Sequence, residues 1–213
     1  MGAEIALIFG SVDNGNWEYL SRYRGNVHVF CADGGIHLAR KAGFRPEVYV
    51  GDGDSGGKAG NGIASVTLPV EKDVTDLQAA FTYACNQGFR EVIFTACTGG
   101  RQDHHLANLQ LLQLAARKGV RARIVDPDNE IRYVENETVK FSCAGFQYFS
   151  LLPMDEILSG VTIENAKYPL AHVTVRRGDS LTVSNEPKDG PVTITVEKGA
   201  AWLVLSQRLD RKK

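Results

Sequence analysis

The sequence predicts an α/β domain with a mainly parallel sheet, followed by an all-β sandwich domain. From Ile5 to Val125, short β-branched runs alternate with amphipathic helical patterns, several of which end at a glycine. After Val125 only short strand patterns follow, separated by turn residues at intervals of about 8 to 12 residues. We therefore expect residues 1–126 to form the α/β domain and residues 127–213 to form the β-sandwich domain.

The strands expected in the first domain are apolar runs bounded by Gly, Asp or Pro. They are IALIFG at 5–10, VHVFCA at 27–32, VYVGD at 48–52, ASVTLP at 64–69, EVIFTA at 91–96 and RARIVD at 121–126. Helical patterns lie between them at 16–23, 35–43, 74–88 and 103–119. Gly43, Gly88 and Gly119 are placed to adopt the left-handed conformation that ends a helix. Such alternation is typical of βαβ units, which place helices on both faces of a parallel sheet.

The second domain is expected to consist of short strands. They are IRYVE at 131–135, VKFS at 139–142, FQYFSLLP at 146–153, GVTIE at 160–164, LAHVTV at 170–175, DSLTVSN at 179–185, PVTITVE at 191–197 and AAWLVLS at 200–206. Gly, Pro, Asn and Asp separate them, which is the pattern of a sandwich or a barrel.

The amino-acid composition indicates a folded, globular protein and argues against several other classes. Hydrophobic residues make up 43% of the 213 residues and charged residues 23%, which is enough apolar material for a packed core. Lys plus Arg number 24 and Asp plus Glu 25, so the net charge of -1 argues against nucleic acid as a partner. We find neither a signal peptide nor an apolar stretch of the ~20 residues that span a membrane, and expect a cytoplasmic protein without a membrane partner. Four scattered cysteines lack the CxxC spacing of zinc sites and are expected to be buried thiols.

Polar segments, three of them with glycines, follow four consecutive strands, at the edge where an open parallel sheet binds its ligands. They are ADGG at 32–35, GDGDS at 51–55, EKDVTD at 71–76 and TGGRQDH at 98–104. Asp52 and Asp54 are separated by one residue, so in an extended segment they point to the same side and can share a cation. Such hard oxygen ligands suit Mg²⁺, although Asp and Gly are also common in simple polar turns.

Further carboxylates accompany that pair. Asp76 falls in the first turn of a helix, where the helix dipole also favours a carboxylate, and Asp73 is at least as well suited to cap that helix as to act in a site. Several carboxylates on one rim would repel one another strongly unless a divalent cation neutralised them. We therefore expect Asp52, Asp54 and Asp76 to hold Mg²⁺.

The TGGRQDH segment supplies the opposite charge. Its two glycines allow a close backbone approach, free amides at the start of a helix bind anions, and Arg101 is able to clamp a phosphate with two hydrogen bonds. Together with a metal on neighbouring strands, this predicts a phosphoryl-transfer site. The absence of GxxxxGK[ST], of GxGxxG before a helix and of GxSxG argues against P-loop NTPases, dinucleotide-dependent dehydrogenases and serine hydrolases. His104 and His105 follow in the helix, but adjacent helical residues do not face one point, so a shared metal is not expected.

Taken in order, these segments resemble the motifs of bacterial thiamine pyrophosphokinases. The matching series is ADGG, GDxDS, KDxTD and GGRxDH, and KYPL at 167–170 with SNE at 184–186 matches the second domain of that family. Together the motifs span most of the chain. Two departures are Gly53, where the family usually has a bulky apolar residue, and Asn165-Ala166, where it usually has Gly-Leu.

The resemblance implies an α/β domain that binds ATP and Mg²⁺, and a β-sandwich domain that binds thiamine. It also implies a homodimer with active sites shared between subunits, and a reaction in which ATP and thiamine give AMP and thiamine diphosphate. We expect Arg101 to act in catalysis with the three aspartates. The residues expected to bind ATP are Asp33, Gly34, Lys72, Asp73, Thr75, Gly99, Gly100, Asp103 and Asn108. Those expected to bind thiamine are Ser184, Asn185 and Trp202.

Two other functions are compatible with the sequence. A related pyrophosphokinase acting on a hydroxymethyl-pterin would keep every aspartate and change only the acceptor pocket. A catalytically inactive nucleotide-binding homologue would keep the fold without turnover. Trp202 also has a structural alternative, because its neighbours in AAWLVLS are apolar and a buried Trp there needs no ligand.

Overall fold

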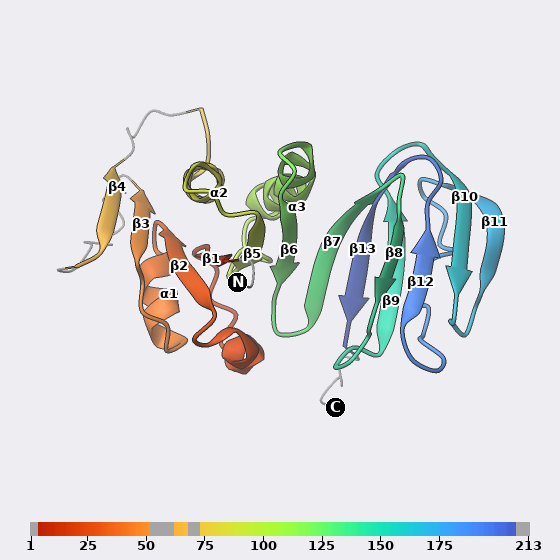
Figure 1. Ribbon diagram of the computed structural model, residues 1–213, viewed down its shortest axis with the longest axis horizontal. Coiled ribbons are helices and arrows are strands. Elements are labelled where there is room, and N and C mark those ends of the chain that lie inside the picture. Colours follow the sequence, from red (N-terminus) through yellow and green to blue (C-terminus); the bar gives the residue numbers. More distant parts are fainter. Residues whose placement is uncertain (1–3, 52–61, 68–72, 208–213) are drawn as a thin grey trace. The chain divides into compact units, whose positions relative to one another are not determined.

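The computed structural model describes residues 4–51, 62–67 and 73–207 and divides the chain into two compact units (Figure 1). Unit 1 comprises residues 1–127 and unit 2 comprises residues 128–213, each with its own hydrophobic core. In the part of the chain that the structure describes, no helix is long and apolar enough to cross a membrane.

The sheet of unit 1 is parallel and reverses its strand order at one point. Its described strands are Ile5–Phe9 (β1), Val27–Ala32 (β2), Val48–Gly51 (β3), Ala64–Thr67 (β4), Glu91–Thr95 (β5) and Arg121–Val125 (β6). They lie in the order β4-β3-β2-β1-β5-β6, and each neighbouring pair is parallel (Figure 1). The first strand of the chain therefore lies between β2 and β5, and the order reverses there. Such a switch point marks the crevice where open α/β sheets bind ligands.

Helices cover both faces of this sheet, as predicted. The helical segments are the 3₁₀ helix Glu18–Tyr23 (η1) and the α-helices Gly35–Lys41 (α1), Asp76–Asn86 (α2) and Gln102–Arg117 (α3). Leu7 and Phe9 of β1 belong to one core cluster with Leu20 of η1 and Ile36 of α1. On the opposite face, Phe94 of β5 packs on Phe81 of α2, with ring centroids 5.6 Å apart.

Three helices end at the glycines predicted from the sequence, whereas one helix begins later than predicted. Gly43, Gly88 and Gly119 have φ values of 79°, 97° and 66°, in the left-handed region that terminates a helix. The cap of α2 is Thr75, whose Oγ1 accepts a hydrogen bond from the N–H of Gln78 (3.2 Å). The suggestion that Asp73 caps this helix is therefore wrong, because the helix begins two residues later than the sequence indicated.

Unit 2 is an antiparallel β-sandwich. Its described strands are Asn129–Glu135 (β7), Thr138–Phe141 (β8), Tyr148–Pro153 (β9), Ile157–Glu164 (β10), Leu170–Arg176 (β11), Val192–Thr195 (β12) and Ala200–Ser206 (β13). β13 pairs with β7 and β9 in one layer, and the other layer has the order β11-β10-β12-β8. Fully buried side chains of both layers form one core, including Phe149, Leu151 and Leu203 from the first and Val161 and Ile194 from the second.

The segment DSLTVSN is not the strand that its sequence predicts. Leu181 and Val183, the apolar residues of the alternating pattern, are 56% and 43% exposed. Thr182 is buried instead, and its Oγ1 donates a hydrogen bond to the carbonyl of Leu151 (2.6 Å). Ser184 has a φ of 57°, which interrupts an extended chain. Hydrogen bonds from a hydroxyl to the backbone compete with the hydrogen bonds between strands, and in this segment the hydroxyl bond forms instead.

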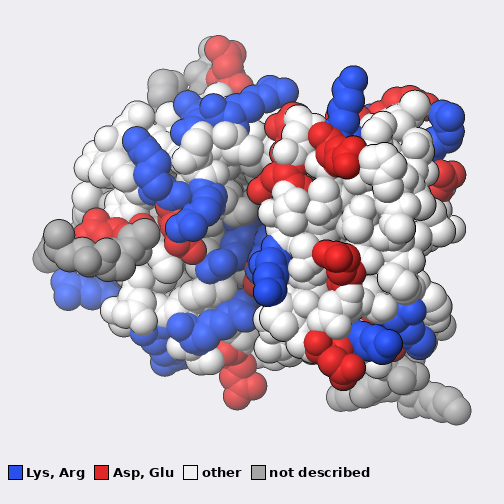
Figure 2. Space-filling view, turned by 45° about the vertical axis from the view of Figure 1, so that its right-hand side comes forward, with Lys and Arg blue, Asp and Glu red and all other residues white. Residues whose placement is uncertain are grey.

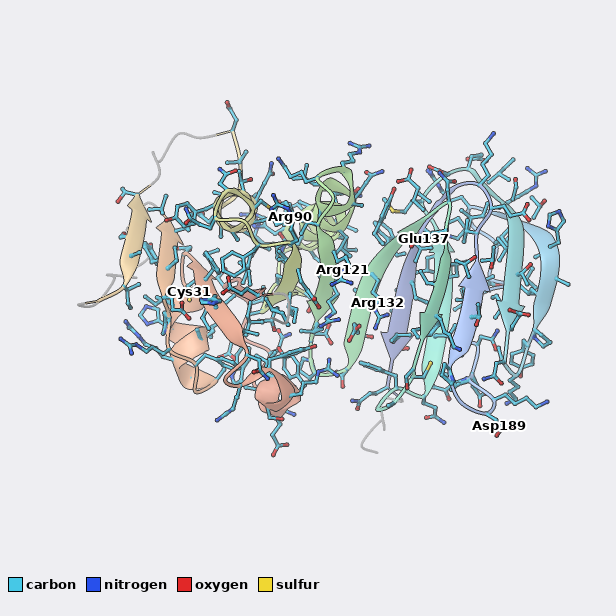
Figure 3. All side chains as sticks on the ribbon, viewed as in Figure 1. Cys31, Arg90, Arg121, Arg132, Glu137 and Asp189 are labelled. Atoms are coloured by element: carbon cyan, nitrogen blue, oxygen red, sulfur yellow. The ribbon has the colours of Figure 1, made fainter. Side chains whose placement is uncertain are left out.

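The cysteines are free thiols. Cys31 of β2 (Figure 3), Cys97 and Cys143 are buried, and Cys85 is half-buried. Burial raises the pKa of the Cys31 thiol to about 12. A thiol that stays protonated is a poor nucleophile and a poor metal ligand, in agreement with a packing role.

Charged side chains of both signs occur across the face of the molecule shown in Figure 2. Exposed ion pairs include Lys41 with Asp13 and Lys167 with Glu186, each at 2.7 Å. Exposed pairs of this kind contribute little to stability, because water and salt screen them. The distribution is consistent with the net charge of -1.

Candidate functional site

The candidate site lies at the carboxyl end of the unit 1 sheet, where the loops after β1 and β5 meet. The N–H of Gly10 donates to the carbonyl of Thr95, and that of Val12 to the carbonyl of Ala96, both at 2.8 Å. A Cβ on Gly10 would lie 2.5 Å from the Ala96 oxygen, so this approach requires glycine. These contacts join the two loops at the point where the strand order reverses.

The predicted anion loop follows β5 directly. Gly99 and Gly100 have φ values of 80° and 66°, so the chain takes two successive left-handed steps before α3. The N–H of Gly99 donates to Nδ1 of His105 (3.1 Å). Within the described residues, the N–H groups of Gly100 and Arg101 have no hydrogen-bond partner. Two free amides at the start of a helix form a position suited to an anion.

The side chain of Arg101 is held by Asp103. Its Nε and Nη2 donate to the two carboxylate oxygens at 3.2 and 2.6 Å, and both side chains are mostly exposed. Hydrogen bonding within this pair lowers the pKa of Asp103 and raises that of Arg101. To clamp a phosphate, the guanidinium would exchange one acidic partner for another. Because the pair is exposed, that exchange costs little.

Three side chains, one after β1, one after β6 and one in α3, support the loop from Cys97 to Gly100. Oγ1 of Thr98 donates to Asp126 (3.0 Å), and Asn14 donates to Thr98 at the longer distance of 3.5 Å. Nδ2 of Asn108 donates to the carbonyl of Cys97 (2.9 Å). Asn108 is 9% exposed, so this residue, predicted to bind ATP, supports the loop through a buried contact.

Sequence reasoning missed Asn14 and Asp126. Both follow strands of the parallel sheet, β1 and β6, and so lie at the same rim as the predicted residues. Their position at the rim could have been predicted, because the carboxyl ends of all parallel strands lie at this edge of the sheet. Neither residue belongs to a glycine-rich cluster, and Asp126 is the last residue of the run RARIVD at the expected domain boundary.

Asp33 carries an unusual carboxylate. It has a φ of 48°, and its N–H donates to the carbonyl of Val50 (2.9 Å) at the end of β3. Its Oδ1 is buried and has no hydrogen-bond partner among the described residues. A Cβ on Gly51 would lie 3.4 Å from the Asp33 Cα, so Asp33 sits beside the chain that leads into Asp52. A buried carboxylate oxygen without a donor is costly, and a bound cation would satisfy it. This oxygen is therefore compatible with a cation at the end of β3.

The predicted metal ligands are only partly visible. Asp52, Asp54 and Lys72 lie outside the described residues. Asp76 is the first residue of α2, and Asp73 is exposed before it. In the described part of the chain, no group of three or more His, Cys, Asp or Glu side chains is arranged to hold a metal ion. The Mg²⁺ site stays a prediction.

In unit 2, Asn185 joins the two motif segments of the second domain. Its side chain is buried, with Oδ1 accepting from the N–H groups of Tyr168 (3.1 Å) and Glu186 (2.9 Å). Nδ2 donates to the carbonyl of Tyr168 (2.8 Å). Ser184 is exposed, and its N–H donates to Oγ of Ser150 (2.9 Å). Asn185 therefore shapes this surface, whereas the Ser184 side chain is accessible on it.

Trp202 lies on the face of β13 that points away from the sandwich core. Its neighbours Ala201 and Leu203 are fully buried in that core, and strand alternation places Trp202 on the other side. It pairs across the sheet with Tyr133 and Leu152. Within the described residues, its Nε1 is buried without a hydrogen-bond partner. Trp202 is therefore not a sandwich-core residue, and its ring remains a candidate for ligand contact.

The fold and the candidate site define a class: proteins that combine an α/β unit, with a glycine turn at its switch point, and an antiparallel β unit. Residues 20–124 match the family described as thiamin pyrophosphokinase, catalytic domain, and residues 129–201 match thiamin pyrophosphokinase, vitamin B1 binding domain. The chain belongs to the thiamin pyrophosphokinase family.

Individual relatives agree with this assignment. The chain is 30% identical over 143 residues to thiamine pyrophosphokinase of Bacillus subtilis, an alignment that covers 64% of each protein. The crystal structure of thiamine pyrophosphokinase from Bacillus subtilis matches with a TM-score of 0.88 at 26% identity, covering 96% of this chain and 100% of that one. The structure from Geobacillus thermodenitrificans matches with a TM-score of 0.85 at 28% identity, covering 97% and 99%.

Proposed function

We propose that the chain transfers the diphosphoryl group of ATP to the hydroxyl of thiamine, giving thiamine diphosphate and AMP. The observation that carries this proposal is that one chain matches both the catalytic domain and the vitamin B1 binding domain of the family. The switch-point geometry supports it, because open α/β sheets bind their ligands at such a position.

In the proposed reaction, the hydroxyl oxygen of thiamine attacks the β-phosphorus of ATP. A new oxygen–phosphorus bond forms, the bond between the β-phosphorus and the bridging oxygen of AMP breaks, and the hydroxyl proton is released. Such transfers depend on positioning and on cationic stabilisation of the phosphoryl oxygens. The free amides of Gly100 and Arg101 and the Arg101 guanidinium are suited to hold the triphosphate.

Mg²⁺ is the proposed cofactor, with Asp52, Asp54 and Asp76 as its ligands. When bound, the ion would neutralise charge on the phosphoryl oxygens. The Oδ1 of Asp33 beside the end of β3 supports a cation at this rim, because it is buried and has no partner within the part of the chain that the structure describes. The remaining residues proposed to bind ATP are Gly34, Lys72, Asp73, Thr75, Gly99, Asp103 and Asn108.

Thiamine is proposed to bind to unit 2 through the ring of Trp202 and the hydroxyl of Ser184. Thiamine is flat and cationic, and an aromatic face attracts such a ligand. Asn185 would contribute by holding the surrounding backbone. We also propose a homodimer with sites shared between subunits. Mixing Asp52→Asn chains with Trp202→Ala chains should then restore activity, and no recovery after verified subunit exchange would contradict the shared site.

The alternatives differ in the acceptor or in turnover. A hydroxymethyl-pterin pyrophosphokinase is not favoured, because the second family match is to a vitamin B1 binding domain. An inactive nucleotide-binding homologue is not favoured either, since the named relatives are thiamine pyrophosphokinases.

The test is product formation by the purified chain with ATP and Mg²⁺. AMP and thiamine diphosphate are expected in equal amounts, only when thiamine is present, and chelation of Mg²⁺ should stop both. AMP formation with a hydroxymethyl-pterin in place of thiamine would indicate the other pyrophosphokinase. Binding of ATP without any AMP formation would indicate the inactive homologue.

A further inference from the structure

His105 makes a contact that its sequence neighbourhood does not suggest. It lies in the first turn of α3, directly after the GGRxDH motif, and is half-buried. Its Nδ1 accepts a hydrogen bond from the N–H of Gly99 at 3.1 Å. The accepting nitrogen carries no proton, so the neutral ring holds its proton on Nε2. By contrast, the preceding His104 is exposed.

The contact acts on the glycine pair of the loop. Asn108 holds the carbonyl of Cys97, and Asp126 holds the hydroxyl of Thr98, so both anchor the residues before the glycines. Two successive glycines have large conformational freedom that must be restricted for one shape to persist. Among the described residues, His105 is the one side chain that forms a hydrogen bond with the backbone of this glycine pair.

The N–H of Gly99 is occupied by this bond, whereas the next two amides of the chain have no partner among the described residues. These belong to Gly100 and Arg101, at the start of α3. We propose that His105 is a positioning residue that fixes the glycine turn, so that these two amides are ready to bind the triphosphate. The proposal rests on the proposed function, because it takes ATP as the anion.

Two substitutions separate the hydrogen bond from the bulk of the side chain. His105→Leu keeps similar volume without an acceptor, whereas His105→Asn places Oδ1 the same number of bonds from Cβ as Nδ1 of histidine. Loss of one such bond is expected to raise the KM for ATP roughly 3- to 10-fold in His105→Leu. The KM for thiamine should change by less than about twofold, because the bond does not act on the acceptor. His105→Asn should recover most of the loss. Gln110→Leu, an exposed position on the same helix, is the matched control.

An unchanged KM for ATP in His105→Leu, or equal impairment of His105→Asn and His105→Leu, would overturn the proposal. Equilibrium binding of ATP with Mg²⁺, measured by calorimetry, gives the same comparison without turnover. If the unaltered chain binds ATP but forms no thiamine diphosphate, the proposed function fails while this comparison still decides the role of His105. If the unaltered chain does not bind ATP, both proposals fail.

The unaltered chain provides a measurement that does not depend on how the variants fold. In ¹⁵N-labelled protein, the neutral ring of His105 should carry its proton on Nε2, and the Nδ1 resonance should show an unprotonated acceptor. A proton on Nδ1 of the neutral ring would be incompatible with the bond to Gly99 and would overturn the proposal.

Discussion

Gly35→Ala is expected to destabilise unit 1, whereas Gly34→Ala should leave its stability unchanged or slightly raised. A Cβ on Gly35 would lie 2.4 Å from the carbonyl oxygen of Phe9 and 2.7 Å from that of Gly10. Both atoms belong to the backbone at the end of the central strand β1, so they cannot move aside as a flexible side chain can. A Cβ on Gly34 would meet Cβ of Ser11 at 3.5 Å, an ordinary contact.

The size of the difference follows from these distances. Forcing extra volume into a packed region costs about 1–3 kcal/mol. Replacing glycine by alanine in a helix returns about 1 kcal/mol, which leaves a net loss of up to about 2 kcal/mol for Gly35→Ala. With a urea dependence of about 2 kcal/mol per M, the unfolding midpoint should fall by up to about 1 M. Gly34 has a φ of -57°, so alanine fits there and should stabilise by up to about 1 kcal/mol.

The two tryptophans make the assay specific to unit 1. Trp17 lies in unit 1 and Trp202 in unit 2, so fluorescence in a Trp202→Phe background reports on unit 1 alone. Urea unfolding of Gly34→Ala and Gly35→Ala in that background gives the two midpoints. Equal midpoints, or a lower midpoint for Gly34→Ala, would refute the steric argument. Because Gly34 is a candidate ATP contact, its variant should still show a raised KM for ATP.

Three further outcomes test the site and the core. Asp52→Asn should lower turnover at least about 100-fold with circular dichroism unchanged, since loss of the cation removes several kcal/mol of charge stabilisation; near-normal turnover would reject Asp52 as a ligand. Trp202→Ala should raise the KM for thiamine much more than that for ATP, and equal effects on both would argue against ring contact. Cys31 should resist thiol reagents in the folded protein at about pH 8, because its pKa of about 12 keeps it protonated; rapid labelling would contradict this burial.

The strands of unit 1 were predictable because parallel strands are buried on both faces and therefore form continuous apolar runs. VHVFCA, for example, matches the bounds of β2, Val27–Ala32. The strand predicted at DSLTVSN does not form. The prediction was wrong because a turn segment can show the same alternation of apolar and polar residues as a strand. Leu181 and Val183 carry that pattern, yet both side chains are exposed. Alternation alone does not tell which face is covered.

The candidate site was predictable where its residues cluster in sequence, as in ADGG and TGGRQDH. It was not predictable where it depends on strand order, because no local pattern reveals that β1 lies beside β5. Asn14 and Thr98 come within hydrogen-bond distance only through that neighbourhood. The sequence does not predict a role for His105, because its contact with Gly99 depends on the left-handed turn that the structure shows.

The central place of β1 has a consequence for folding during synthesis. β1 is synthesised before both of its neighbours and soon meets β2, but its other edge stays unpaired until residues 91–95 have been made. Exposed strand edges are templates for pairing with other chains, and such long-range parallel pairing is slow. The nascent chain therefore passes through a stage in which its innermost strand is an open edge. Aggregation at that stage, rather than low stability of the finished fold, would limit the yield of chains in which β5 is altered.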